Sequence, residues 1–90
     1  MEKSNLIVYS KPDCPMCVLT KNYLENRGLE YEERDISKKK DWEEEVLALG
    51  YMQLPVVVKL YPDESPHGVV RDSISGFNIP ALDKLIESFE

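Results

Sequence analysis

The amino-acid sequence predicts a single α/β domain, residues 1–90, in which one mixed four-stranded sheet is covered by helices on both faces. The chain has 90 residues, about the size of one domain, and 42% of them are hydrophobic, enough for a modest core. Short continuous apolar runs, typical of buried strands, alternate with apolar stripes at helical spacing. In chain order these patterns read βαβαββα. We expect strands joined through a helix to pair in parallel and the last two strands to form an antiparallel hairpin.

The first half of the chain contains two predicted strands and the first helix. Residues 6–9 form a continuous apolar run with two β-branched members, which is typical of a buried strand. Residues 15–26 follow a helical pattern, and Gly28 ends this helix. The residues expected on one face of the helix are Cys17, Thr20, Lys21 and Leu24. Residues 31–36 form a weaker strand, whose many charges indicate an exposed or edge position.

A second helix and the most apolar strand follow. We expect Ser37 or Asp41 to cap this helix, which ends at Gly50. Its apolar residues at i, i+4 and i+7 are Trp42, Val46 and Leu49, which we assign to the core. Residues 54–58 form the most hydrophobic strand, a candidate for the centre of the sheet. Pro55 stands at the start of that strand, where a missing N–H is tolerated.

The last third of the chain completes the sheet and adds a helix. Residues 62–68 are rich in turn-forming residues, and residues 69–74 form a strand close enough in sequence to be a hairpin partner. Asn78 is expected to cap the last helix, with Pro80 in its first turn. The expected inner face of this helix consists of Ile79, Leu82, Leu85, Ile86 and Phe89.

Composition and charge exclude several classes of function. Acidic residues outnumber basic ones by 17 to 11, and the net charge is −6, so we expect neither a nucleic acid nor an anionic membrane as a partner. The sequence contains no run of about 18 apolar residues, which is the length needed to span a membrane. The apolar run near the N-terminus is too short for a signal peptide. We therefore expect a soluble, cytoplasmic protein that is a monomer.

The two cysteines, Cys14 and Cys17, carry the chemistry that the sequence predicts. They are too close together to brace a fold, and in a reducing cytosol such a pair is more often catalytic or metal-binding than structural. Cys14 precedes Pro15 at a strand-to-helix turn, so its sulfur should lie beside the free N–H groups of the helix start, which favour the thiolate. Lys11 adds a nearby positive charge. We assign Cys14 as the nucleophile and Cys17, one turn further, as the resolving thiol.

Other interpretations of these residues compete with the redox one. A tetrahedral zinc site needs about four ligands, and besides the cysteines the chain has a single histidine, His67, which we interpret as a solvated loop residue. A metal shared between two chains remains an alternative. A structural disulfide is disfavoured because the ring is too short to constrain much of the chain. Met16, between the cysteines, is expected to be exposed and suited to docking, although simple packing would also account for it.

Across nearly its whole length, the sequence resembles the glutaredoxin branch of the thioredoxin fold and, more narrowly, the NrdH-redoxins. The stretches that carry the resemblance are Cys14-Pro15-Met16-Cys17, Glu25-Asn26-Arg27-Gly28, Gly50-Tyr51-Met52-Gln53-Leu54-Pro55-Val56-Val57 and Ser75-Gly76-Phe77. The resemblance implies that Pro55 is a cis-proline facing the two cysteines. It also implies that the backbone of Leu54 pairs with an extended partner peptide.

The resemblance further implies a partner and a source of electrons. NrdH-redoxins are reduced by thioredoxin reductase and pass electrons to class Ib ribonucleotide reductase. We therefore expect no bound cofactor, and electrons that come from NADPH through a flavoprotein reductase. One alternative is a glutathione-dependent glutaredoxin. Another, of a different class, is a metal or iron–sulfur carrier that bridges a dimer through Cys14.

The comparison with glutathione-dependent glutaredoxins separates the first two possibilities. Glutaredoxins resemble this chain at Lys11, which in them holds a glutathione carboxylate, but they usually have Tyr where Met16 stands and Thr-Val where Gln53-Leu54 stand. They also have an Asp, an anchor for the glutathione amine, in the region of residues 75–78, where this chain has none. We expect Phe77 to form an apolar patch with Met16 and Leu54 around the cysteines, although a plain packing contact at the helix start is an equal alternative. The residues expected to contact a partner are Lys11, Pro15, Met16, Leu54, Pro55, Gly76 and Phe77.

Overall fold

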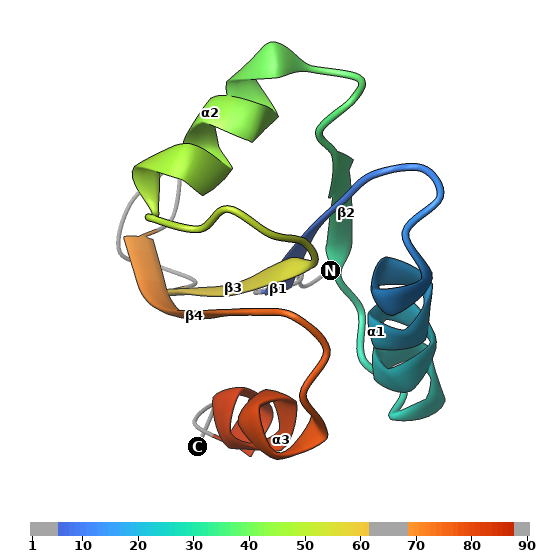
Figure 1. The fold of residues 1–90 in the computed structure, drawn as a ribbon. Coiled ribbons are helices and arrows are strands. Elements are labelled where there is room, and N and C mark those ends of the chain that lie inside the picture. Colours follow the sequence, from blue (N-terminus) through green and yellow to red (C-terminus); the bar gives the residue numbers. More distant parts are fainter. Residues whose placement is uncertain (1–5, 62–68, 88–90) are drawn as a thin grey trace.

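The structure, a computed structural model, describes residues 6–61 and 69–87 and contains the elements in the predicted order βαβαββα (Figure 1). The elements are β1 (Leu6–Ser10), α1 (Pro15–Asn26), β2 (Glu32–Asp35), α2 (Lys40–Ala48), β3 (Val56–Tyr61), β4 (Val69–Ser75) and α3 (Ile79–Glu87). The predicted turn at residues 62–68, with His67, and the predicted core residue Phe89 lie outside the described residues. Within the described residues, no helix is long and apolar enough to cross a membrane.

The strands lie in the order β2-β1-β3-β4. β1 and β2 pair in parallel, as expected for strands joined through a helix, whereas the expected parallel pairing across α2 is wrong. β3 lies on the other side of β1 and runs antiparallel to it, with Val56 opposite Tyr9. α2 therefore returns the chain to the end of the sheet where β1 and β2 finish, and β3 runs back from there. β4 pairs antiparallel with β3 and completes the predicted hairpin.

Helices cover both faces of the sheet, as predicted, with α1 and α3 on one side and α2 on the other (Figure 1). Alternate residues of the central strands β1 and β3 point to opposite faces and build two cores. The core beneath α1 and α3 contains Leu6, Val8, Leu24, Val57, Leu82, Leu85 and Ile86. The core beneath α2 contains Ile7, Tyr9, Val46, Val56 and Val58, with Trp42 and Leu49 packed against it. Strands covered on both faces bury side chains in both directions, which explains the continuous apolar runs in the sequence.

The start of α2 differs from the prediction. Neither Ser37 nor Asp41 caps it, because the N-cap residue is Lys39, whose side chain makes no capping hydrogen bond. Ser37 instead donates its hydroxyl and its backbone N–H to Oδ1 of Asp35, at 2.6 and 2.9 Å. Asp41 lies in the first turn, where its carboxylate interacts favourably with the helix dipole. The polar residues before α2 therefore stabilise the preceding turn rather than the helix end.

The start of α3 confirms one prediction and corrects another. Asn78 Oδ1 accepts a hydrogen bond from the backbone N–H of Ala81 at 3.1 Å, so Asn78 caps the helix as expected. Ile79, however, was expected on the inner face and is 41% exposed. It is the first residue of the helix, and the buried part of the inner face begins one turn further along, at Leu82.

Polar contacts fasten α2 to the sheet. The Tyr9 hydroxyl donates to Oε1 of Glu45 at 2.7 Å, and Arg34 Nη1 donates to the same oxygen at 2.9 Å. Burial, together with the hydrogen bond to Glu45, raises the pKa of Tyr9 to about 12, so the hydroxyl remains a neutral donor at neutral pH. These contacts join β1, β2 and α2 at the second core.

Lys59 of β3 is a buried lysine that was not expected from the sequence. Its side chain is 1% exposed, and its Nζ donates to the backbone carbonyl of Leu85 in α3 at 3.3 Å. A buried ammonium group is tolerated only where partners replace its water. Lys59 thus connects the sheet to α3 beneath the first core, and its position in a strand of valines gave no sign of this in the sequence.

Candidate functional site

Cys14 occupies the N-cap position of α1, and Pro15 follows at the first helical position, as the sequence predicted. The backbone N–H of Cys17 donates to Sγ of Cys14 at 3.2 Å. The backbone N–H of Val18 donates to the carbonyl oxygen of Cys14 at 3.1 Å. The sulfur of Cys14 therefore lies at the positive end of the helix and accepts a hydrogen bond from one of its free N–H groups, an arrangement that stabilises a thiolate.

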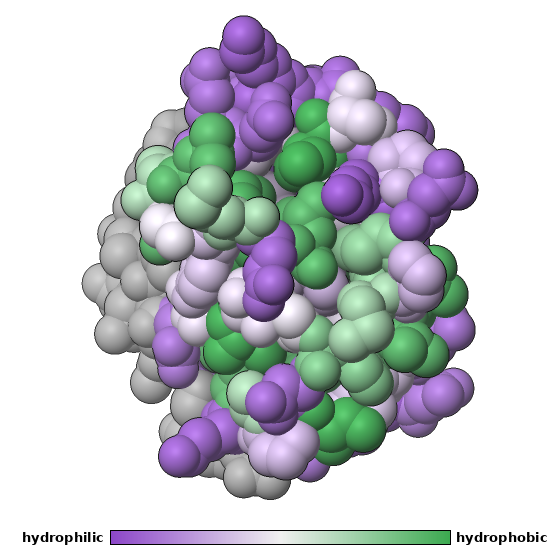
Figure 2. Space-filling model, viewed as in Figure 1, coloured by the Kyte–Doolittle hydropathy of each residue, from purple (hydrophilic) through white to green (hydrophobic). Residues whose placement is uncertain are grey.

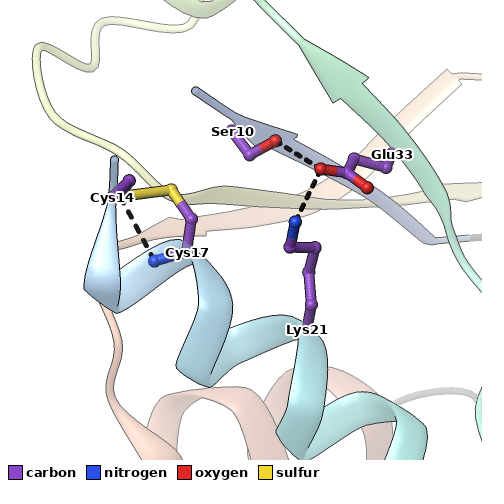
Figure 3. The surroundings of a disulfide bond; sticks show 5 residues. All are labelled: Ser10, Cys14, Cys17, Lys21 and Glu33. Carbon is purple, nitrogen blue, oxygen red and sulfur yellow. Dashed lines mark hydrogen bonds and ion pairs between the residues drawn. A yellow bond between two sulfur atoms is a disulfide. The ribbon is translucent and has the colours of Figure 1, made fainter. Parts of the chain in front are cut away.

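The two cysteines form a disulfide bond across the first turn of α1 (Figure 3). Their Cα atoms are 5.2 Å apart, within the range in which a disulfide closes without moving the backbone. Cys14 is 8% exposed and Cys17 is 1% exposed, so the sulfur that a partner could reach belongs to Cys14. The expectation that Cys14 attacks and Cys17 resolves remains a prediction, which this difference in exposure favours.

A tight turn between β1 and α1 places Cys14 beside an open groove. Asp13 has φ of 59°, in the left-handed region that Asp tolerates better than most residues. Lys11, Pro12 and Asp13 of this turn are exposed, and they border an open groove of about 460 Å³ beside Cys14. The other residues that line this groove are Pro15, Val18, Lys21, Glu33 and Asp35. Two of the predicted partner contacts, Lys11 and Pro15, thus line one groove with Cys14.

A polar cluster lies beside the disulfide, between α1 and the edge of the sheet (Figure 3). Lys21 Nζ forms an ion pair with Oε2 of Glu33 at 2.7 Å, and the buried Ser10 hydroxyl donates to the same oxygen at 2.9 Å. The hydrogen bond from Lys21 lowers the pKa of Glu33, with a smaller contribution from Ser10, against the opposing effect of burial. Lys21 was expected on the same helix face as Cys17, but its partner Glu33 was not expected. The pairing register of β1 with β2 decides which carboxylate Lys21 meets.

Substitution of Glu33 by Gln is expected to lower the free energy of unfolding at neutral pH. The free energy of unfolding of this variant should also depend less on pH in the acid range. Because the pKa of Glu33 is lowered in the folded state, its carboxylate contributes stability above its ordinary pKa, and this contribution is lost as the pH falls through the lowered pKa. The pair is partly exposed, so the loss at about pH 7 should be no more than about 1 kcal/mol. Thermal unfolding followed by circular dichroism from about pH 7 to about pH 3 measures it.

Glu44→Gln is the matched control for this prediction, because Glu44 is exposed on α2 and makes no ion pair with another described residue. The control should leave the unfolding midpoint close to that of the parent protein at each pH. A loss of stability by Glu33→Gln that is as large at about pH 3 as at about pH 7 would contradict the assignment.

Apolar side chains are exposed around the start of α1. Met16 is 42% exposed, as expected for a docking residue, and Val18 and Leu19 beside it are about equally exposed. Figure 2 shows apolar surface over this part of the molecule, interrupted by hydrophilic side chains. Val18 and Leu19 were not singled out in the sequence, because the helical pattern alone does not show that the outer face of α1 is apolar next to the cysteines.

Pro55 and Gly76 lie next to each other in the structure. The Leu54–Pro55 peptide bond is cis, and the backbone N–H of Gly76 donates to the carbonyl oxygen of Pro55 at 2.8 Å. Pro55 is buried, and Gly76 has φ of 78°, a conformation that favours glycine. This hydrogen bond joins the segment before β3 to the segment after β4.

The three residues of the expected apolar patch lie in different surroundings. They are Met16, Leu54 and Phe77. Met16 is exposed, Leu54 packs against the core beneath α2, and Phe77 packs against the core beneath α1 and α3. The Phe77 ring also meets the Tyr23 ring edge-on, with centroids 6.5 Å apart. The packing contact weighed for Phe77 is therefore present. A common patch around the cysteines remains a prediction.

The described residues include no group of three or more His, Cys, Asp and Glu side chains placed to hold a metal ion. The disulfide at the helix start can exchange with a thiol, and the dithiol that this produces can exchange with another disulfide. Thiol–disulfide exchange needs an accessible sulfur, a second sulfur close by and a local environment that favours the thiolate. The helix start provides each of these.

Comparison with known proteins agrees with the fold. The sequence model of the glutaredoxin family, described as glutaredoxin, matches residues 6–59. The glutaredoxin-like protein NrdH of Escherichia coli K12 is 36% identical over 53 residues, which are 59% of this chain and 65% of that protein, a little under two thirds of its length. A glutaredoxin-like protein from the rubredoxin operon of Clostridium pasteurianum is 30% identical over 81 residues, 89% of this chain and 95% of that protein.

The solved structures extend the match beyond the first half of the chain. The structure of the glutaredoxin-like protein NrdH-redoxin from Escherichia coli superposes with a TM-score of 0.72 at 30% identity, covering 89% of this chain and 92% of that one. The chain therefore belongs to the glutaredoxin family, has the thioredoxin/glutaredoxin fold, and resembles the NrdH-like members of that family.

Proposed function

We propose that this protein is a small dithiol electron carrier, reduced by thioredoxin reductase, that delivers electrons to the disulfide of class Ib ribonucleotide reductase. No cofactor is bound in this scheme, and the electrons come from NADPH through the flavin of the reductase. The observation that carries the proposal is the Cys14–Cys17 disulfide at the start of α1, with the less buried sulfur at the helix N-terminus. The cycle needs a reducing compartment, and the cytoplasmic location expected from the sequence remains part of the proposal.

The reaction consists of two exchange steps. In the first, the Cys14 thiolate attacks the client disulfide, which forms a mixed disulfide with Cys14 and releases one client thiolate. In the second, the Cys17 thiolate attacks the sulfur of Cys14, which releases the second client thiolate and leaves the Cys14–Cys17 disulfide. The client gains two electrons and two protons, and the reductase returns the same number to the carrier.

Three observations support thioredoxin reductase over glutathione as the source of electrons. Asn78 is neutral, and its Oδ1 is engaged by the N–H of Ala81, so it offers no charged anchor for the amine of glutathione. Phe77 next to it places an apolar ring against Tyr23 rather than a polar contact. The Escherichia coli NrdH-redoxin, which this chain resembles in structure, is described as having a thioredoxin-like activity profile.

The proposed client follows from the same relatives. The similar proteins from Escherichia coli, Salmonella typhimurium and Lactococcus lactis carry the name NrdH, and the resemblance seen in the sequence links such proteins to class Ib ribonucleotide reductase. The exposed Met16, Val18 and Leu19 beside Cys14 provide apolar surface on which a protein client could dock. A protein client is favoured over a small thiol because these apolar side chains offer contacts beside the disulfide.

The source of electrons is tested by following NADPH oxidation with insulin as a disulfide substrate. We expect turnover with thioredoxin reductase to be faster than turnover with glutathione and glutathione reductase by about tenfold or more. The two reductases without the carrier serve as blanks. Activity only with the glutathione system would contradict the proposed reductant and favour a glutathione-dependent glutaredoxin.

A further inference from the structure

Thr20 presents a buried hydroxyl group that the fold leaves without a partner. Its side chain is fully buried on the inner face of α1. Among the buried side-chain oxygen and nitrogen atoms of the described residues, only Oγ1 of Thr20 makes no hydrogen bond. A buried polar atom without a partner is destabilising, and in native proteins such an atom is uncommon enough to need an explanation. The hydroxyl is therefore expected to find its partner in another state of the protein.

On the buried face of α1, the redox-active group closest in sequence to Thr20 is the sulfur of Cys17. Cys17 and Thr20 are three residues apart in α1 and share its buried face. Side chains at this spacing are neighbours, with Cβ atoms about 5–6 Å apart. Helical side chains also lean toward the N-terminus, so Thr20 leans toward the turn that contains Cys17. In the disulfide form, the Cys17 sulfur is bonded to Cys14 and carries neither a proton nor a charge.

We propose that Thr20 is a positioning residue, whose hydroxyl forms a hydrogen bond with the Cys17 sulfur in the reduced protein. The proposal rests on the redox cycle proposed above. When two electrons and two protons reduce the disulfide, the S–S bond breaks and the Cys17 sulfur is free to turn about its Cα–Cβ bond. The hydroxyl then accepts from the Cys17 thiol or donates to its thiolate, and in either case holds the sulfur beneath Cys14.

This hydrogen bond affects the balance between the oxidised and reduced forms. The oxidised protein contains an unsatisfied hydroxyl, whereas the reduced protein satisfies it, so Thr20 favours the dithiol. The same contact orients the sulfur that must attack the mixed disulfide. Removal of the hydroxyl should therefore make the protein a stronger reductant and slow the resolving step.

The test is to measure the redox equilibrium of Thr20→Val, which keeps the shape of the side chain and removes the hydroxyl. Equilibration in buffers of reduced and oxidised dithiothreitol, followed by alkylation of free thiols and mass spectrometry, gives the fraction reduced. We expect the equilibrium constant for reduction to fall about tenfold, which corresponds to about 30 mV toward more negative potential. Thr20→Ser restores a hydroxyl and should return the equilibrium constant to that of the parent protein.

Ser73→Ala is the matched control, because it removes a half-buried hydroxyl that bonds to Tyr51, away from α1. It should leave the equilibrium constant unchanged. A second measurement separates a redox effect from a structural one. Thr20→Val should raise the thermal unfolding midpoint of the oxidised protein and lower that of the reduced protein, whereas a purely structural role would shift both in the same direction.

The possible outcomes separate this inference from the function on which it rests. An unchanged equilibrium constant for Thr20→Val, in a protein whose cysteines cycle normally, would overturn the role of Thr20 and leave the proposed function intact. Failure of dithiothreitol to reduce and reoxidise the cysteine pair of the parent protein would overturn both. A tenfold fall that Thr20→Ser does not reverse would also contradict the hydrogen bond.

Discussion

Cys14→Ser is expected to reduce disulfide turnover to the background rate of the assay. Exchange begins with a thiolate that displaces one sulfur of a disulfide, and a serine hydroxyl neither ionises near neutral pH nor forms a stable bond to sulfur. Cys17 cannot take over the attack, because its side chain is 1% exposed beneath the first turn of α1. Insulin reduction, coupled to thioredoxin reductase and NADPH, measures the loss.

The control for this variant is Leu47→Ser, an equally polar change at an exposed position of α2 on the opposite side of the sheet from α1. It should retain the turnover of the parent protein. Circular dichroism of Cys14→Ser checks that the fold persists. Turnover clearly above background in a folded Cys14→Ser protein would show that Cys14 is not the nucleophile.

Cys17→Ser is expected to stop the cycle halfway and to accumulate a mixed disulfide between Cys14 and the client. The first exchange needs only Cys14, whereas release of the client needs a second thiolate placed at the sulfur of Cys14. Cys17 is so placed, because the two sulfurs are bonded in the oxidised form and the Cα atoms are 5.2 Å apart. Intact mass spectrometry under non-reducing conditions should show carrier plus client, and dithiothreitol should separate them.

The double variant with both cysteines replaced by serine is the control and should trap nothing. Multiple turnover by Cys17→Ser at the parent rate with a protein disulfide would contradict the resolving role. Turnover of this variant that depends on added glutathione would instead favour the glutaredoxin alternative, because an external thiol would then perform the second step.

Local features of this protein could be predicted because they depend on neighbouring residues. The position of Cys14 before Pro15 defines the helix start, and a spacing of three residues is enough to place Cys17 one turn below it. The predicted elements are present within the described residues, and the apolar runs of β1 and β3 correctly indicated strands buried on both faces.

Contacts between distant segments were predicted less well. The direction of β3 was wrong, because periodicity locates α2 but not the end of the sheet to which it returns the chain. Glu33 was missed as the partner of Lys21, since the two residues are twelve positions apart and meet only through the register of β1 with β2. Ile79 was expected in the core, but the first turn of α3 lies beyond the part that packs on the sheet.

The sequence by itself determined the chemistry of this protein: a pair of cysteines at a helix start, in a small acidic α/β domain of the glutaredoxin family. Only the tertiary structure decided what surrounds that pair. It placed Cys17 and Thr20 in the interior, paired Lys21 with Glu33 beside the disulfide, and joined Pro55 to Gly76. The physical reason is that helix starts and thiol spacing are set by a few consecutive residues, whereas burial and ion pairing depend on how the whole sheet is assembled.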